Sequence, residues 1–568
     1  MGAIHKSGVW SRSARGGLSQ SGGWLMVLAG AFLVGCGGGG EPPQPEKQKA
    51  VVVEQSAGET EIATPIPAPA PVPNADGIDD FVFGRLQQLG IEPAPPCTDS
   101  VFVRRVFIDL MGTVPTAEEA AAFLDDPGKD KRARLIERLL KRDEFADYWS
   151  MKWGDILRIK AEFPINLWPN AAQAYHRWVR ESIVRNKPYD LMAREMLTSS
   201  GSNFRVGQVN FYRAMQNRTP DGIARTVALT FMGARPEKWQ PERLEAFAAC
   251  FSEVGYKPTR EWKEQIVYWD PEKPSKDLRV ARTNFTAEFK PPPTLKEAAL
   301  PDGTKLVCEP GEDPRKVVAD WLIRPDNEWF APCIVNRVWA WLMGRGIVHV
   351  YDDMRPDNPP SNPGLLEHLA RDFVEHRYDL RHLYRSILNS RAYQLSPEGP
   401  SDDPVAAAHF ASYAMRRLEA EVLIDAINKV TGSYDLYTSA IPEPFTYIPK
   451  DIPAVALADG SITSPFLAMF GRSPRASGFA DEKNNRILAG QWLHLLNSSH
   501  IQRKIETGSG LKAIRGAAPG DRTTLDKLYL RTLSRRPTSQ EASVALAYKI
   551  PDEPGQGGRS IGPTLLGR

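Results

Sequence analysis

Apolar side chains recur at helical spacing through most of the chain after residue 76. In "DSVFVRRVFIDLMG" the positions Val103, Phe107 and Leu110 share one helical face, and Gly112 supplies a stop signal. A capping box that begins at Thr116 opens the next helix. Each such helix must bury its apolar stripe against other elements, so the pattern predicts a mainly α fold.

Aromatic residues follow the same spacing. Phe145, Trp149 and Trp153 lie four residues apart, which places them on one face of a predicted helix, and Trp339 lies on another apolar face. We expect these rings to pack in the core. A second capping box, at Thr538, opens the last clear helix of the chain.

Between the helical regions the pattern changes. The segments "EQIVYWDP", "RVARTNFTAEF" and "TKLVCEP" are typical of short strands. We therefore expect two helical domains with a small β insertion between them: an N-terminal domain at 76–254, a β-containing connector at 255–312, a C-terminal domain at 313–549 and a disordered tail at 550–568.

The N-terminus has the features of an export signal. A basic segment precedes an apolar run from Trp24 to Val34, which has the length of a signal-peptide core. The residues Leu33-Val34-Gly35-Cys36 resemble a bacterial lipoprotein box, in which the cysteine thiol carries a diacylglycerol. We expect a signal peptide at 1–35, lipidation at Cys36 and a Pro/Gly-rich tether at 36–75. Such a chain is anchored in the cell envelope and faces the periplasm or the exterior. An ordinary signal peptide and an uncleaved anchor are the alternatives.

Charge and cysteine usage exclude some classes of partner. The 71 Lys and Arg residues nearly balance the 69 Asp and Glu residues, and no basic stripe is present, so we expect no nucleic-acid partner. Cys97, Cys250, Cys308 and Cys333 form no C-x-x-C pair and predict neither a zinc nor an iron–sulfur site. Two disulfides and a set of buried free thiols both remain open.

Longer stretches resemble known domains. In the first half, "IDDFVFGRLQQLGIEP", "RRVFIDLMGTVPTAEEAAAFL" and "NKPYDLMAREML" resemble a planctomycete-type domain of unknown function catalogued as cytochrome-associated. In the second half, "NRVWAWLMGRGIV", "FGRSPR" and "LYLRTLSRRPTSQE" resemble the partner domain of unknown function that usually follows it. The resemblance implies no established activity.

The chain departs from this family at one chemically important place. Many relatives carry C-x-x-C-H after the helix that matches "VALTFMG", a spacing that attaches haem covalently. Here Cys250 stands alone in the corresponding segment, and no histidine occurs between His176 and His349. We therefore expect no haem and no other cofactor.

Four histidines, His349, His368, His376 and His382, lie close together in the sequence. They lack the H-E-x-x-H order of zinc hydrolases, so we interpret them as solvated helix residues rather than as metal ligands. No catalytic residue is predicted.

Two arginine pairs lie near acidic residues: Arg104-Arg105 near Asp109, and Arg416-Arg417 near Glu419 and Glu421. We expect structural ion pairs between packed helices, with an anion site as the alternative.

The loop after "NRVWAWLMGRGIV" is the candidate binding region, because rigid helices position polar loop residues for recognition. The candidate residues are Asn336 and Arg337, which we expect to open the helix, together with Trp341, Asp352, Asp353, Arg355 and Asn358. Its acidic side chains suit calcium, but Asp, Asn and Pro are also typical of turns. In the structural alternative, Arg337 pairs with Asp352 or Asp353 and pins the loop.

These features favour a membrane-anchored envelope lipoprotein that binds or scaffolds, with polysaccharide or other envelope proteins as candidate partners. One alternative is an enzyme that acts on extracellular polysaccharide. The other is a redox-protein relative that lacks haem.

Overall fold

The computed structural model describes residues 77–277, 294–400, 403–483, 486–516 and 522–547. Cys36, the predicted signal peptide, the whole predicted tether and the predicted tail lie outside these residues. Within the described ranges, no helix has both the length and the apolar character needed to cross a bilayer.

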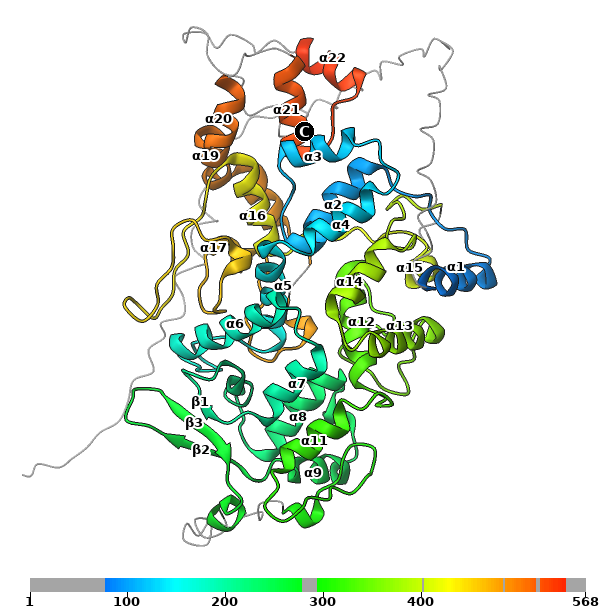
Figure 1. The fold of residues 1–568 in the computed structure, drawn as a ribbon. Coiled ribbons are helices and arrows are strands. Elements are labelled where there is room, and N and C mark those ends of the chain that lie inside the picture. The colour runs from blue at the N-terminus through cyan, green and yellow to red at the C-terminus, as the bar shows by residue number, and fades with distance from the viewer. Residues whose placement is uncertain (1–76, 278–293, 401–402, 484–485, 517–521, 548–568) are drawn as a thin grey trace, which may run out of the picture. The chain divides into compact units, whose positions relative to one another are not determined.

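The first half of the described chain is helical up to residue 249, apart from one short strand (Figure 1). Its α-helices are α1 (Ile78–Leu89), α2 (Asp99–Met111), α3 (Ala117–Asp125), α4 (Lys131–Leu139), α5 (Asp143–Ile156), α6 (Pro169–Val184), α7 (Tyr189–Thr198), α8 (Pro220–Met232) and α9 (Pro241–Ala249).

Helices resume after residue 313 and continue to the end of the described chain. They are α11 (Pro314–Leu322), α12 (Phe330–Met343), α13 (Pro363–Glu375), α14 (Leu380–Asn389), α15 (Pro404–Ala408), α16 (Ala420–Thr431), α17 (Pro465–Met469), α18 (Ala489–Asn497), α19 (Ser499–Thr507), α20 (Ser509–Gly516), α21 (Arg522–Leu533) and α22 (Ser539–Ala547). The predicted mainly α fold is confirmed.

Local capping explains several helix boundaries. The Thr116 hydroxyl accepts the Glu119 N–H at 3.1 Å, and the Glu119 carboxylate accepts the Thr116 N–H at 2.8 Å. At the end of α2, Gly112 takes the left-handed conformation with φ 61°. Both signals could be read directly from the sequence.

The described strands form one small antiparallel sheet with the order β1-β3-β2. Its strands are β1 (Gly201–Ser202), β2 (Val254–Pro258) and β3 (Gln265–Trp269). The strand prediction for "EQIVYWDP" is confirmed. The prediction for "TKLVCEP" is wrong: the segment makes only an isolated bridge between Lys305 and Ala299, because no other strand runs beside it. "RVARTNFTAEF" lies outside the described residues.

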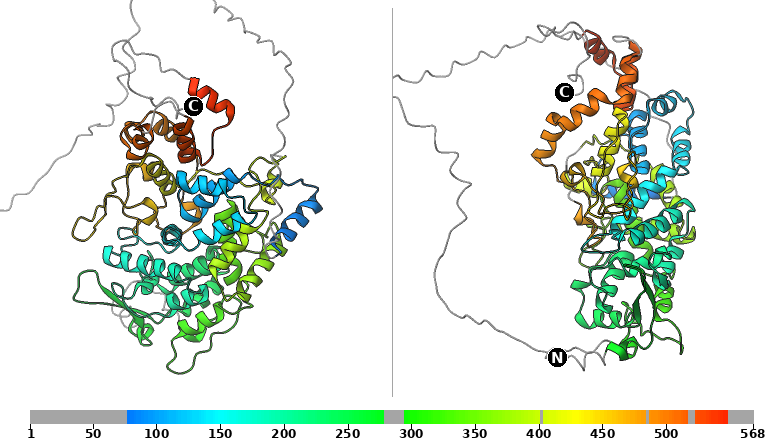
Figure 2. Two further views of the ribbon diagram at one scale, coloured as in Figure 1. Left: turned by 45° about the horizontal axis from the view of Figure 1, so that its top comes forward. Right: turned by 90° about the vertical axis from the view of Figure 1, so that its left-hand side faces the viewer.

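One apolar cluster runs through both helical segments, from Ile78 to Val455. Trp149, Trp153 and Trp339 lie in it and are fully buried, which confirms their predicted core role. Elements far apart in sequence also pack together: α3 lies beside α21, as Figures 1 and 2 show from different directions.

Polar bonds reinforce this docking. The Asp79 carboxylate accepts the N–H groups of Arg391 and Ala392 at 2.9 and 3.0 Å. The Arg105 guanidinium donates to the carbonyls of Tyr393 and Leu395 at 2.6 and 2.9 Å. The segment after α14 is therefore held against α1 and α2 by both charged and apolar contacts.

Candidate functional site

The predicted binding region starts inside a helix rather than at its beginning. The Asn327 side-chain oxygen accepts the N–H groups of Trp329 and Phe330, both at 3.0 Å, and so caps the start of α12. Asn336 and Arg337 consequently lie in the middle of α12 and are completely buried. The expectation that they open the helix is wrong, because Asn327 caps the helix upstream of them and the helix begins at Phe330.

Arg337 is the centre of a buried latch. Its Nε and Nη2 donate to Asp352 Oδ1 at 3.0 and 2.9 Å, and its Nη groups also donate to the carbonyls of Leu229 and Thr230 at the end of α8. The other carboxylate oxygen, Asp352 Oδ2, accepts the Ala480 N–H at 2.8 Å. The predicted ion pair that pins the loop is therefore present.

Two other candidate residues also have internal partners. The Asn336 side-chain amide makes two bonds of 3.0 Å with the backbone N–H and C=O of Val348. The Trp341 ring packs against the buried ring of Trp149, with 5.6 Å between the ring centroids. These contacts fix the path of the loop.

The outer part of the loop binds to itself. Arg355 Nε donates to Asp353 Oδ1 at 2.9 Å, and Asn358 Nδ2 donates to the Asp353 carbonyl at 2.9 Å. Arg355 also pairs with Asp357 at 2.5 Å. The structure thus brings Asp353, Arg355 and Asn358 together, while Arg337 and Asp352 lie deeper.

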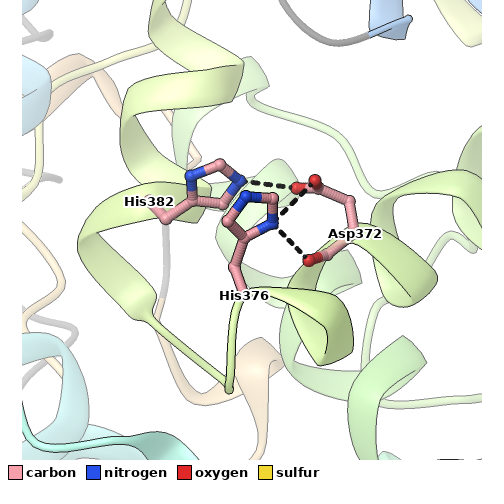
Figure 3. Close-up of side chains that lie close together, drawn as sticks. All are labelled: Asp372, His376 and His382. Atoms are coloured by element: carbon pink, nitrogen blue, oxygen red, sulfur yellow. Dashed lines mark hydrogen bonds and ion pairs between the residues drawn. The ribbon is translucent and has the colours of Figure 1, made fainter.

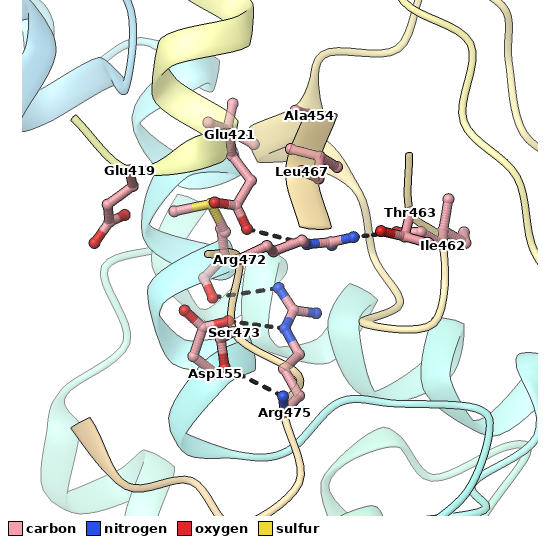
Figure 4. Close-up of polar contacts among 12 residues, drawn as sticks. Asp155, Glu419, Glu421, Ala454, Ile462, Thr463, Leu467, Arg472, Ser473 and Arg475 are labelled. Atoms are coloured by element: carbon pink, nitrogen blue, oxygen red, sulfur yellow. Dashed lines mark hydrogen bonds and ion pairs between the residues drawn. The ribbon is translucent and has the colours of Figure 1, made fainter. Parts of the chain in front are cut away.

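A charged network adjoins this latch. Arg475 Nε donates to Asp155 Oδ1 at 2.9 Å, and Arg472 Nε donates to Glu421 Oε1 at 3.0 Å (Figure 4). Both arginines come from the "FGRSPR" segment. A Cβ at Gly154 would lie 3.0 Å from the Arg475 guanidinium carbon, so any side chain at this position in α5 would push the buried Arg475 guanidinium aside.

Two lysines extend the network. Lys483 Nζ lies 2.7 Å from Asp155 and 3.2 Å from Glu419, and Lys152 Nζ lies 2.5 Å from the other Glu419 oxygen. Together with Trp341, Tyr351 and Asp352, these groups line a small pocket.

The electrostatics of this pocket indicate permanent ion pairs. Burial by itself would raise the pKa of Glu419, but Lys152 and Lys483 outweigh it and lower the pKa to about 2. Burial would also raise the pKa of Asp155. Lys483 and Arg475 outweigh this effect, so the pKa of Asp155 is lowered overall. A glycosidase needs one protonated carboxyl group, and neither residue supplies it at neutral pH.

A larger groove lies between α2 and segments of the second half. We call it the basic groove, and its free volume is about 490 Å³, which lies in the size range of ligand sites, roughly 300–1,000 Å³. Its lining residues are Ser100, Val101, Arg104, Arg105, Ile108, Asp109, Pro397, Tyr413, Met415, Arg416, Leu418, Leu533 and Arg535. Four of these are arginines.

Two of the four arginines are neutralised. Arg416 pairs with Asp109 at 2.8 Å, and Arg535 pairs with Glu541 at 2.6 Å. Asp109 does form a structural ion pair, but the predicted partners Arg104 and Arg105 are wrong, since the carboxylate pairs with Arg416.

Arg104 and Arg105 have no carboxylate within ion-pair distance among the described residues. Arg104 Nη1 donates to the Thr532 carbonyl at 2.9 Å and to Ser534 Oγ at 3.3 Å. Burial lowers the pKa of Arg104, and no acidic partner opposes this effect. Arg105 donates only to carbonyls, and its guanidinium lies 3.7 Å from the centre of the Tyr413 ring. The groove therefore carries uncompensated positive charge.

Apolar surface accompanies this charge. Val101, Met415 and Leu533 line the groove and are 39, 79 and 44% exposed. The arrangement suits a ligand with both an anionic group and an apolar face. Sequence reasoning identified the arginine pairs but not the groove, since its walls come from positions hundreds of residues apart.

The four cysteines of the described residues form no disulfide. Cys97, Cys250, Cys308 and Cys333 are free thiols, which settles the alternative left open by the sequence. Burial raises the pKa of Cys250 to about 12 and that of Cys333 to about 11, so both stay protonated at neutral pH.

Comparison with known proteins gives two matches to family models. Residues 77–237 match the PSCyt2 protein of unknown function (DUF1549), and residues 314–549 match the PSD1 protein of unknown function (DUF1553). No curated protein and no solved structure matches the chain. The basic groove lies between these two matched segments. The chain therefore belongs to the planctomycete-type proteins that carry these two domains of unknown function in tandem.

Proposed function

We propose that this protein is an envelope lipoprotein, anchored through Cys36, that binds anionic polysaccharide in the basic groove. The observation that carries the proposal is Arg104, a guanidinium without an acidic partner in a groove with exposed apolar walls.

The ligand chemistry follows from the groove. A guanidinium presents a planar fork of N–H donors that matches a carboxylate or a sulfate group. Arg104 supplies such a group and Arg105 adds positive charge behind it, while Val101, Met415 and Leu533 offer apolar contact. A polysaccharide with acidic substituents carries charged groups and apolar ring faces together, and an open groove admits a long chain.

The anchor follows from the sequence. An apolar run precedes Leu33-Val34-Gly35-Cys36, and a Pro-rich segment separates this cysteine from the first described helix. One acyl chain holds a protein only marginally, whereas the several chains of a lipoprotein hold it stably. The groove would then face the medium that contains envelope and extracellular polysaccharides.

In the small charged pocket, the state of the two carboxylates favours binding over catalysis. Asp155 and Glu419 share Lys483 and are both held ionised. The described pocket therefore offers ion pairs rather than an acid and a base.

The test is a binding assay with the full-length chain in detergent. A polyuronate and dextran sulfate should bind, neutral dextran should not, and binding should weaken with salt. Arg104→Gln should weaken binding about tenfold or more, because a hydrogen bond to a charged group is lost. Arg104→Lys should restore part of it, since the charge remains but the fork is lost.

Arg205→Gln is the matched control, because the Arg205 side chain is 83% exposed and lies outside the groove. Equal binding of neutral and acidic polysaccharides, or equal affinities of the Arg104→Gln and Arg205→Gln proteins, would refute the proposal. Pull-down of an envelope protein with no retained polysaccharide would instead support a protein partner.

A further inference from the structure

We propose that Asp372, His376 and His382 form a binding site for a divalent transition-metal ion. Each residue offers one ligand atom, and the three atoms lie within 4.8 Å of one another. Figure 3 shows both imidazole rings directed at the same carboxylate. The site is separate from the basic groove and does not depend on the proposed function.

The turn between α13 and α14 brings these residues together. Asp372 lies in the last turn of α13, and His376 caps that helix. Arg377 and Tyr378 then take left-handed conformations, with φ of 55° and 57°. Such angles are uncommon for residues other than glycine, so the surrounding structure must enforce them.

Contacts around the turn provide this support. The Tyr378 hydroxyl donates to the Ile323 carbonyl at 2.9 Å, and its ring packs edge-on against Phe373. Asp379 caps α14 by accepting the His382 N–H at 3.0 Å. His382 therefore lies in the first turn of α14 at a fixed position, facing back toward Asp372.

The ligand atoms already have short separations. His382 Nε2 lies 2.8 Å from Asp372 Oδ2, and His376 Nδ1 lies 3.0 Å from Asp372 Oδ1. The two rings stack with centroids 3.6 Å apart. Zinc binds such ligand atoms at roughly 2.0–2.2 Å. Two ligand atoms on one zinc ion therefore lie only slightly farther apart than the 2.8 and 3.0 Å separations seen here, and small side-chain movements would admit the ion.

The side chains of the three residues differ in how much they can move. The side chains of Asp372 and His382 are 12 and 14% exposed, whereas that of His376 is 49% exposed. Two ligands are thus held in place, and the third can rotate to meet an ion that enters from solvent. Burial by itself would raise the pKa of Asp372, but the hydrogen bond to His382 and the charges of the neighbouring histidines together outweigh it and lower the pKa.

The donor set selects the class of metal. Two imidazole nitrogens and one carboxylate oxygen suit zinc and neighbouring first-row ions rather than calcium or magnesium, which prefer oxygen ligands alone. Three protein ligands would leave a coordination position for water or for a group of another molecule.

The test uses the full-length chain, purified in detergent through an affinity tag without histidine. Calorimetric titration with Zn²⁺ should show one ion per chain, and Co²⁺ should give the visible absorption of a low-symmetry site. His376→Ala, His382→Ala and Asp372→Asn should each weaken zinc binding by more than tenfold, because even changes outside the ligand sphere cost roughly 10- to 100-fold.

His349→Ala is the matched control, since His349 is exposed and lies outside the cluster. If Asp372→Asn or His382→Ala fails to fold, the half-exposed His376→Ala decides the question. Absence of stoichiometric Zn²⁺ binding, or equal affinity of the His376→Ala and His349→Ala proteins, would overturn the proposal.

Discussion

The Arg416 guanidinium donates to the Asp109 carboxylate at 2.8 Å across 307 positions of sequence. Asp109 also accepts the hydroxyls of Tyr393 and Tyr413, at 2.8 and 2.9 Å. One carboxylate in α2 therefore gathers three donors from the second half of the chain, and it forms part of the wall of the basic groove.

Asp109→Ala should destabilise the protein by about 3 kcal/mol, because a buried carboxylate loses its bonds to one guanidinium and two hydroxyl groups together. Asp109→Asn should cost less, since the amide oxygen still accepts one bond. Chemical denaturation of both variants measures the difference. If Asp109→Ala lowered the free energy of unfolding by less than about 1 kcal/mol, the Asp109–Arg416 pair would be no stronger than an ordinary surface ion pair.

Much of the fold could be predicted because helix signals are local. The stop at Gly112 and the capping boxes at Thr116 and Thr538 depend on residues within one turn of each other. Helical spacing likewise placed Trp149 and Trp339 in the core. The prediction of a strand at 304–310, the segment "TKLVCEP", was wrong because a strand needs a neighbouring strand, which the residue pattern of one segment does not reveal.

The candidate sites were less accessible to sequence reasoning. The sequence pattern singled out the arginine pairs and the four histidines, but it did not indicate which residues they contact in the folded protein. Asp109 pairs with Arg416 rather than with its neighbours, and His376 meets His382 rather than His368. Only the turn between α13 and α14 and the docking of the two halves create these combinations.

Lipidation of Cys36 is directly testable. Metabolic labelling with a fatty acid should mark the wild-type chain and not Cys36→Ala, and the variant should be released from the membrane fraction. Cys308→Ala is a suitable control, because Cys308 lies in the folded region and is a free thiol. Equal labelling of the wild type and Cys36→Ala would contradict lipidation at this position.

The absence of C-x-x-C-H from the full sequence predicts that the chain carries no covalent haem. A pyridine haemochrome spectrum of protein produced together with the haem-attachment machinery should be blank. A stoichiometric haem signal would instead favour the redox alternative.

His176 should make stability depend on pH. It is 8% exposed, and burial lowers its pKa to about 3, with Arg475 and Arg180 acting in the same direction. The unfolded chain binds a proton near pH 6.5, whereas the folded chain does not until about pH 3. Stability from this residue is therefore fully present above pH 6.5 and falls by about 1.4 kcal/mol per unit as the pH drops below it.

The comparison protein for this prediction is His176→Phe, in which the titrating group is removed. Between pH 6.5 and about 4.5 the wild type should lose more stability than the variant, while above pH 7 their difference should stay constant. Parallel stability curves throughout would show that His176 does not titrate abnormally.

The Arg337–Asp352 latch should matter far more for stability than the outer loop. Both side chains are at most 2% exposed, and Asp352→Ala would leave Arg337 buried with carbonyl partners only, at a cost of about 3–5 kcal/mol. The pair Asp353 and Arg355 lies nearer the surface, with side chains 14 and 30% exposed.

The double change Asp353→Ala with Arg355→Ala should therefore cost less than about 1 kcal/mol. It should also leave polysaccharide binding unchanged, because neither residue lines the basic groove. Thermal melting and the polysaccharide assay on the same samples separate the possibilities. A large fall in melting temperature would show that the outer pair pins the loop, whereas lost binding at an unchanged melting temperature would assign recognition to the loop and not to the groove.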